Sequence, residues 1–550
     1  MSEPELEIET ADPDGTAVPD ETAVPHRRLV MQAAGLVSAA FLLSRIIGLG
    51  REVVAKYYLG LGLPSLAFDA AQRLPESIFL IVAGGAIGSA FIPTFSAYFE
   101  RKDEKGGWRL FSAVTNLALL ATTAVALITF IFARPFILFF LRKLVADDPQ
   151  LLEMTVRLMR IMLLSPIIFS VGGVVMGALQ ARQHFLLPAL APSIYNLGII
   201  AGAVFWPTSL GDGKAMGMAV GTVVGALGYL LVQLPALKMK QATYSPIINL
   251  HDPGVRQVLK LMAPRVLGLS FSEVNKFATL FLSGLMSATS LPALTLAWKI
   301  MIMPQGILGQ AMGTAAFPTL ASLAARRAFA EMRQILADSL RMLLFLGLPA
   351  TVLLITAGEP AIHILFERGL FVAEDTTLVT WALLFYAAGL VALIALEVVN
   401  RAFYALNDTL TPVLAGGVQI ALMTALGYWL SQFVFPQRGW LPLGGVALGH
   451  SLSNLLEVGL LLWLLRRKMG GLGGGWDDVA RMFLAAMLMA AASWLTIMQM
   501  TRWQWAAFWQ LIIGSAIGGL VYLGASYGLR IKEIGWAWQL ARRILRKRRD

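Results

Sequence analysis

Long apolar runs alternate with short polar loops along almost the whole chain. An α-helix needs about 20 apolar residues to cross the hydrocarbon core of a bilayer, and the runs reach that length. The pattern therefore predicts an all-α polytopic membrane protein with about 14 transmembrane helices. The predicted spans are residues 30–58, 66–97, 111–134, 154–179, 188–206, 215–237, 256–284, 292–323, 336–357, 376–403, 411–431, 444–465, 479–500 and 506–529.

Lys and Arg gather in alternate loops between these spans. The loops at 59–65 and 285–291 contain neither residue, and the loop at 432–443 contains only Arg438. The loops that alternate with them hold basic clusters, of which the first contains Arg101, Lys102, Lys105 and Arg109. Because cytoplasmic loops carry the excess of Lys and Arg, we expect both termini on the cytoplasmic side.

The first twelve predicted helices fall into two similar halves. SRIIGLG at 44–50 resembles PRVLGLS at 264–270, and SAFIPT at 89–94 resembles TAAFPT at 314–319, at nearly the same shift. Six spans are an even number, so the two bundles share one orientation and are related by an axis along the membrane normal. The sequence thus predicts two pseudo-symmetric six-helix bundles followed by two extra helices.

Composition refines this division of the chain. Charged residues make up only 14% of the sequence, against about 25% in soluble proteins. Residues 1–28 contain eight acids and four prolines, which favours disorder. The predicted parts are 1–28 as a disordered acidic cytoplasmic tail, 29–245 and 246–470 as the six-helix lobes, 471–530 as helices 13 and 14, and 531–550 as a basic amphipathic cytoplasmic helix on anionic lipid.

The net charge of +11 comes from basic clusters spread over many loops rather than from one patch. We therefore expect membrane lipids as neighbours and no nucleic acid. The chain has no cysteine, which excludes disulfides and thiolate metal sites. Its five histidines are scattered and form no metal-ligand motif, so no metal is predicted.

Charged residues inside the predicted spans are the main functional signal. Each costs about 2.5–3.5 kcal/mol at the bilayer centre, so such residues should line a wet cavity or pair with one another. They concentrate in predicted helices one, two, seven and eight, the first two of each half. The candidate cations are Arg45, Arg51, Lys56, Arg73, Arg265, Lys276 and Lys299, and the candidate acids are Glu52, Asp69, Glu76 and Glu273.

Two interpretations of these charges stay open. Cations exceed acids in helices one, seven and eight, which indicates a cavity for an anionic substrate such as a diphosphate. Alternatively, the charges are internal salt bridges, and Asp69 and Arg73 have the i, i+4 spacing for one.

A polar triplet in the predicted helix at 444–465 is a weaker candidate. His450, Asn454 and Glu457 lie at i, i+4 and i+7, on one helical face. They could bind a coupling cation or relay protons. Hydrogen bonding between helices is the alternative.

Several stretches resemble the MurJ/MviN family of lipid II flippases, within the superfamily that includes multidrug exporters. They are SRIIGLGRE (44–52), GALQARQHFLLPALAPSIYNLGII (177–200), LAWKIMIMPQGILGQAMGTAAFPTLA (296–321) and LFERGLF (365–371). The resemblance implies a V-shaped pair of bundles around a cationic cavity, with helices 13 and 14 forming a groove for a long lipid tail.

The resemblance also implies roles for individual residues. The essential arginines of the family in helix one fall on Arg45 and Arg51, with an acid at Glu52, and its helix-eight arginine falls on Lys299. The chain departs from the family at three positions in its second predicted span. An acid, an arginine and a second acid are replaced there by Leu66, Phe79 and Gly84.

We therefore expect a flippase of the bacterial inner membrane that carries undecaprenyl-diphosphate-linked lipid II to the outer leaflet by alternating access. We expect no enzyme activity and no cofactor, with Na⁺, H⁺ or the membrane potential as energy source. We also expect a monomer, with cell-wall synthesis proteins as candidate partners. The alternatives are a flippase for another polyprenyl-diphosphate-linked sugar, a cation-coupled multidrug exporter, and a non-transporting cell-wall scaffold.

Overall fold

The computed structural model describes residues 23–81, 86–474 and 476–535. These ranges contain helices and their connections, with no β-strand among them. The predicted acidic tail and the predicted basic C-terminal helix lie mostly outside the described residues. Helix α1 begins at Ala23, earlier than the predicted boundary at residue 29.

The helices of the first half of the chain are α1 (Ala23–Leu59), α2 (Leu63–Phe79), α3 (Ala86–Glu100), α4 (Glu104–Phe140), α5 (Arg142–Asp147), α6 (Pro149–Met162), α7 (Leu164–Ala181), α8 (Leu186–Phe205), α9 (Gly213–Leu231), α10 (Leu234–Met239) and α11 (Pro253–Ser283).

The helices of the second half are α12 (Ser290–Ala325), α13 (Phe329–Thr356), α14 (Gly358–Phe366), α15 (Ala373–Ala387), α16 (Leu390–Ala405), α17 (Leu410–Trp429), α18 (Phe435–Gln437), α19 (Leu443–Met469), α20 (Val479–Arg502) and α21 (Ala507–Gly528), with a π-helical turn at Leu430–Val434 and a 3₁₀ turn at Trp476–Asp478.

The all-helical membrane fold is confirmed. Among the described residues, ten helices or joined helices are long and apolar enough to cross a membrane, or eleven when the bent pair α15–α16 counts as one span. The three other predicted spans correspond to α1, to α2 with α3, and to α11. Helices α2 and α3 are each shorter than 18 residues, and α1 and α11 carry several of the charged residues of the site. The count of fourteen is compatible with this fold and stays a prediction.

Several predicted spans are divided into shorter helices, and two of the breaks have a clear local cause. The span at 154–179 breaks at Leu163, where α7 restarts with Pro166 in its first turn. Proline has no N–H to donate, so it is tolerated where a new helix begins. The span at 376–403 bends by 45° between α15 and α16. Gly389 lies in this bend, where an added Cβ would come within 2.6 Å of the Ser451 hydroxyl.

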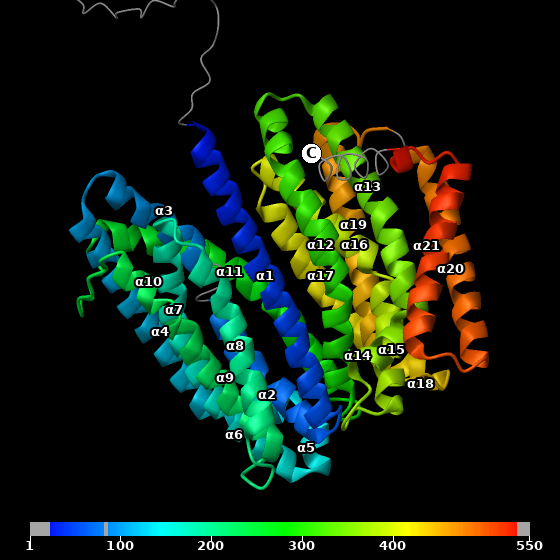
Figure 1. The fold of residues 1–550 in the computed structure, drawn as a ribbon, viewed down its shortest axis with the longest axis horizontal. Coiled ribbons are helices and arrows are strands. Elements are labelled where there is room, and N and C mark those ends of the chain that lie inside the picture. The colour runs from blue at the N-terminus through cyan, green and yellow to red at the C-terminus, as the bar shows by residue number, and fades with distance from the viewer. Residues whose placement is uncertain (1–22, 82–85, 475, 536–550) are drawn as a thin grey trace, which may run out of the picture.

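The helices form two lobes with separate cores. In Figure 1 the first half of the chain packs on one side and α12–α19 on the other, while α1 runs between them. Helices α20 and α21 lie at the outer edge of the second lobe. Tyr522 of α21 donates a hydrogen bond to the Phe345 carbonyl of α13 at 2.7 Å, which ties this pair to the second lobe.

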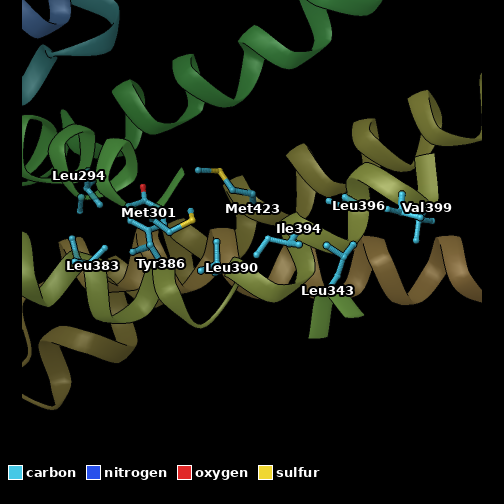
Figure 2. Packing of buried hydrophobic residues seen from close by; sticks show 14 of the residues in the cluster. Leu294, Met301, Leu343, Leu383, Tyr386, Leu390, Ile394, Leu396, Val399 and Met423 are labelled. Atoms are coloured by element: carbon cyan, nitrogen blue, oxygen red, sulfur yellow. The ribbon is translucent and has the colours of Figure 1, made fainter. Parts of the chain in front are cut away.

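The core of the second lobe brings together α12, α13, α15, α16 and α17. Figure 2 shows Leu390 and Ile394 of α16 among Met301 of α12, Leu383 of α15 and Met423 of α17. All of these side chains are almost completely buried. Such dense packing makes the lobe suited to move as a rigid body.

Helix α11 bridges the two lobes. Val255 and Val258, near its start, pack with Phe91 and Trp108 in the core of the first lobe. Leu282, near its end, belongs to the core of the second lobe. The predicted lobe boundary at residue 246 therefore falls just before a helix that both lobes share.

Candidate functional site

A cavity of about 690 Å³ lies between the lobes. Its walls come from α2 on one side, from α11 and α12 in the middle, and from α15, α16, α17 and α19 on the other side. Ligand pockets have volumes of about 300–1,000 Å³, so this cavity is large enough for a polar headgroup.

The first cluster of charges joins α1 to α12 through a shared carboxylate. Glu52 of α1 accepts Lys299 of α12 at 2.8 Å and Arg51 at 2.5 Å. The Lys299 side chain is 35% exposed and lines the cavity, whereas the Glu52 side chain is 11% exposed. One carboxylate therefore faces two cations, which leaves this cluster with a positive surplus.

A second group of charges is a buried ion pair next to the first cluster. The Lys56 ammonium lies 3.3 Å from the Asp69 carboxylate and donates to the Ser65 hydroxyl at 2.7 Å. Lys56 is 3% exposed and lines a small pocket beside the cavity rather than the cavity itself. Asp69 thus pairs with Lys56 of α1, not with its predicted i, i+4 partner Arg73, because a buried ammonium needs a compensating carboxylate.

A third cluster connects α2 with α11. Lys276 lies 3.0 Å from Glu273 of its own helix and 3.6 Å from Glu76 of α2. Ser77 of α2 donates a hydrogen bond to Glu273 at 2.6 Å. The contacts of Glu76 and Ser77 cross from one lobe to the other.

Among the described cations that line the cavity, Arg73 is the one without an ion pair. Its Nη2 donates to the hydroxyl of Thr295 on α12 at 2.6 Å, and its buried Nε has no hydrogen-bond partner. Among the described residues no carboxylate forms an ion pair with it. Arg73 lines the cavity and therefore offers a ligand a guanidinium that no ion pair occupies.

Two other predicted cations lie elsewhere. Arg45 is exposed, and its guanidinium lies against Gly306 of α12, where an added Cβ would be 3.2 Å from Nη1. It does not contribute to the described lining of the cavity. The side chain of Arg265 lies outside the part of the chain that the structure describes.

The structure combines the two interpretations that the sequence left open. Most of the charges form salt bridges, and the bridges of Lys299 and Lys276 also line the cavity. The clusters around the cavity contain one more cation than acid, and Glu457 on the far wall balances this surplus. Their members are Arg51, Lys56, Arg73, Lys276 and Lys299 against Glu52, Asp69, Glu76 and Glu273.

The polar triplet of the sequence also reaches the cavity. His450, Asn454 and Glu457 of α19 line its far wall. Within the described residues, no three His, Asp or Glu side chains are grouped as a metal site would require. Any cation held here would depend mainly on amide and hydroxyl oxygens.

Sequence reasoning missed the uncharged lining of the cavity. Trp298, Tyr386, Asn275 and Gln419 all line it, and Asn275 donates a hydrogen bond to Gln419 at 3.0 Å. Polar and aromatic residues within apolar spans were the only sign of this lining in the sequence. Such residues occur at many other positions of this chain, so the sign does not single out the cavity. Only the packing of the helices separates these residues from the others.

Two of the three positions that depart from the family pattern hold side chains in hydrophobic contacts. Leu66 is completely buried in a core cluster of the first lobe. The Phe79 ring packs in a tilted arrangement against that of Phe169, with the ring centroids 4.5 Å apart. Hydrophobic contacts therefore replace the charges expected there, while Gly84 lies outside the described residues.

Sequence comparison places the chain near a single family. The model of the family described as "Lipid II flippase MurJ" matches residues 55–515. The lipid II flippase MurJ of Burkholderia cenocepacia is 29% identical over 441 residues, which are 79% of this chain and 84% of that protein. The probable lipid II flippase MurJ of Haemophilus influenzae is 26% identical over 522 residues, covering 88% and 98%.

Structure comparison agrees on the fold. A lipid II flippase MurJ in an inward closed conformation superposes with a TM-score of 0.73 at 24% identity, covering 90% of this chain and 99% of that one. An inward-facing multidrug transporter of the MATE family in the MOP superfamily superposes with a TM-score of 0.67 at 14% identity, covering 80% and 98%.

Proposed function

The chain belongs to the lipid II flippase MurJ family, and from this membership we infer that it moves lipid II across the bacterial cytoplasmic membrane. Lipid II is a polyprenyl diphosphate that carries amino sugars and a peptide. Its charged headgroup cannot cross the hydrocarbon core unaided. The protein supplies a polar cavity through which the headgroup passes while the tail stays in lipid.

One observation carries this function. Cations from both lobes, Arg73 of α2 with Lys276 and Lys299 of α11 and α12, line the same cavity. Arginine and lysine together recognise diphosphate oxygens through charge-assisted hydrogen bonds. Arg73 is available without breaking an ion pair, so we assign it the first contact with the diphosphate.

Binding of the diphosphate also changes the contacts between the lobes. The pairs Lys299–Glu52 and Lys276–Glu76 each join one lobe to the other. A diphosphate competes with Glu52 and Glu76 for these lysines, which are partly exposed. Weaker pairing across the lobes favours their separation, so substrate binding promotes the rocking movement of alternating access.

The lobes are held together at the end where α1 finishes. The Leu370 amide of the LFERGLF segment donates a hydrogen bond to the Tyr57 carbonyl at 2.9 Å. With both termini on the cytoplasmic side, this contact seals the cavity on the outer side. We infer that lipid II enters the cavity from the cytoplasmic side.

Transport also needs a source of energy. The membrane potential acts on any charge that moves across the membrane with the lobes, with about 2.3 kcal/mol per charge per 100 mV. Coupling to Na⁺ or H⁺ would use His450, Asn454 and Glu457 on α19. The chain works as a monomeric carrier and breaks no covalent bond, with cell-wall synthesis proteins as candidate partners.

Complementation tests the function directly. We expect the chain to restore growth of a bacterium depleted of its own lipid II flippase and to restore lipid II at the outer leaflet. Arg73→Gln should lower outer-leaflet lipid II at least tenfold, because the guanidinium that no ion pair occupies is lost. Arg438→Gln, which changes an exposed loop cation, is the matched control and should behave as wild type.

A well-expressed chain that leaves lipid II trapped inside would contradict the proposal. The substrate would then be another polyprenyl-diphosphate-linked sugar, an alternative suggested by Leu66 and Phe79. Normal rescue by Arg73→Gln would instead indicate a scaffold or a transporter with a different site.

A further inference from the structure

The cavity changes in character from one end to the other. Helices α2, α11 and α12 contribute charged side chains to it, among them Arg73, Lys276 and Lys299. Helices α15, α16, α17 and α19 contribute aromatic and uncharged polar side chains. In the described lining, Glu457 is the only charged side chain from these four helices.

Two adjacent residues of helix α12 face opposite ends of the cavity. Lys299 points to the first lobe and pairs with Glu52 at 2.8 Å. Trp298 points to the second lobe, where its ring lies 4.5 Å from that of His450 and 5.4 Å from that of Tyr386. Successive side chains on a helix diverge by about 100°, so one helix serves both ends.

Helix α11 repeats this division. Lys276 pairs with Glu76 of the first lobe at 3.6 Å. Its neighbour Asn275 donates a hydrogen bond to Gln419 of α17 at 3.0 Å. Two bridging helices thus direct a cation to one end of the cavity and a neutral group to the other.

The neutral end contains buried polar atoms without partners. Within the described residues, Asn454 Nδ2, both ring nitrogens of His450, and Asn400 Oδ1 accept or donate no hydrogen bond. Asn454 is 3% exposed and His450 is 7% exposed, and both line the cavity. Buried polar groups in proteins are nearly always paired, so these atoms call for a ligand.

We propose that this neutral end, formed by Trp298, Tyr386, Asn400, His450 and Asn454, binds the amino sugars of the lipid headgroup. The inference rests on the proposed function, which places the diphosphate at the charged end. The apolar face of a pyranose ring stacks on Trp298 and Tyr386. Sugar hydroxyl and N-acetyl groups then pair with the unpartnered amide and imidazole atoms.

Charge favours the sugars over the peptide of lipid II. The peptide carries carboxylates, and α15, α16, α17 and α19 contribute no Lys or Arg to the described lining that would bind them. A metal cation is also disfavoured, because no group of three His, Asp or Glu side chains lies together among the described residues. Amino sugars combine an apolar face with several neutral donors and acceptors, which matches the chemistry of this wall.

The test measures binding to the full-length protein in lipid nanodiscs. The probes are undecaprenyl diphosphate, the same lipid with one N-acetylamino sugar, and complete lipid II. We expect Asn454→Leu to weaken binding of both sugar-bearing lipids roughly tenfold, the value of a buried hydrogen bond. Binding of undecaprenyl diphosphate should change less than twofold.

Further variants keep the result interpretable. Gln437→Leu removes an exposed amide from α18, outside the cavity lining and not part of α20 or α21, and should change none of the three affinities. Asn400→Leu, which is less buried, replaces Asn454→Leu if the latter lowers thermal stability. Arg73→Gln should weaken the binding of all three lipids alike, since each carries the diphosphate.

Three outcomes would overturn the sugar site. In the first, Asn454→Leu weakens the binding of all three lipids equally. In the second, it weakens the binding of complete lipid II alone. In the third, it abolishes only the dependence of binding on Na⁺. The proposed function fails differently, since then Arg73→Gln would leave diphosphate binding unchanged. A wild-type protein that flips lipid II but binds undecaprenyl diphosphate equally well would contradict only the sugar site.

Discussion

At the scale of single residues, cations that are equivalent candidates in the sequence have different surroundings in the structure. Lys56 is buried and bound to Asp69, whereas Arg73 lines the cavity and has no carboxylate partner among the described residues. Both were candidates for substrate binding on sequence alone. Their surroundings give Lys56 a structural role, and the proposed function assigns Arg73 to the substrate.

This difference predicts the effect of Lys56→Met. The substitution leaves the Asp69 carboxylate buried without its cation, which should cost about 3–5 kcal/mol of unfolding free energy. Thermal unfolding of the purified protein measures the loss. The double variant Lys56→Met/Asp69→Leu removes both charges and should recover most of the stability. An unchanged melting temperature in the single variant would show that the pair is not needed for folding.

At the scale of elements, α8 and α9 pack through glycines. An added Cβ on Gly202 would lie 2.0 Å from the Gly217 carbonyl oxygen, and one on Gly225 would lie 2.5 Å from the Tyr195 carbonyl oxygen. Small residues let membrane helices approach closely, where van der Waals contact drives their association. The surface between these two helices therefore depends on the absence of side chains.

We accordingly expect Gly202→Ala to separate α8 from α9. Overpacking of this kind costs about 1–3 kcal/mol, and thermal unfolding in detergent should detect it. Gly524→Ala on α21 is the matched control, because nothing lies within 4 Å of its added Cβ. Equal melting temperatures for the two variants would contradict the close packing of α8 and α9.

At the scale of the whole molecule, two lobes meet at a backbone contact. Gly369 has φ of +67°, and an added Cβ would lie 2.4 Å from the Tyr57 carbonyl oxygen. The neighbouring Leu370 amide bonds to that same oxygen. A side chain at Gly369 would therefore push the lobes apart at the predicted outer seal.

Gly369→Ala should shift the protein toward separated lobes. The chain has no native cysteine, so spin labels on Ser209→Cys and Gln504→Cys report one distance without interference. We expect a longer distance in Gly369→Ala than in the labelled parent. Gly439→Ala has a similar φ of +69° but nothing within 4 Å of the added Cβ, so it should leave the distance unchanged. Identical distances in all three proteins would exclude a seal at Gly369.

The sequence by itself determined the membrane-spanning helices, since apolar length and the spacing of Lys and Arg are local properties of the chain. It also determined which helices carry charge, because a charge within an apolar run is visible without coordinates. Family membership was predictable from the stretches at 44–52 and 296–321, and comparison confirms it.

Only the tertiary structure decided which charges meet. Glu52 lies next to Arg51 in sequence, but its contact with Lys299 depends on how α1 packs against α12. The neutral wall around Trp298 and Asn454 likewise forms from helices far apart in the chain. Pairing between distant side chains depends on the relative rotation and position of whole helices, which no local pattern records.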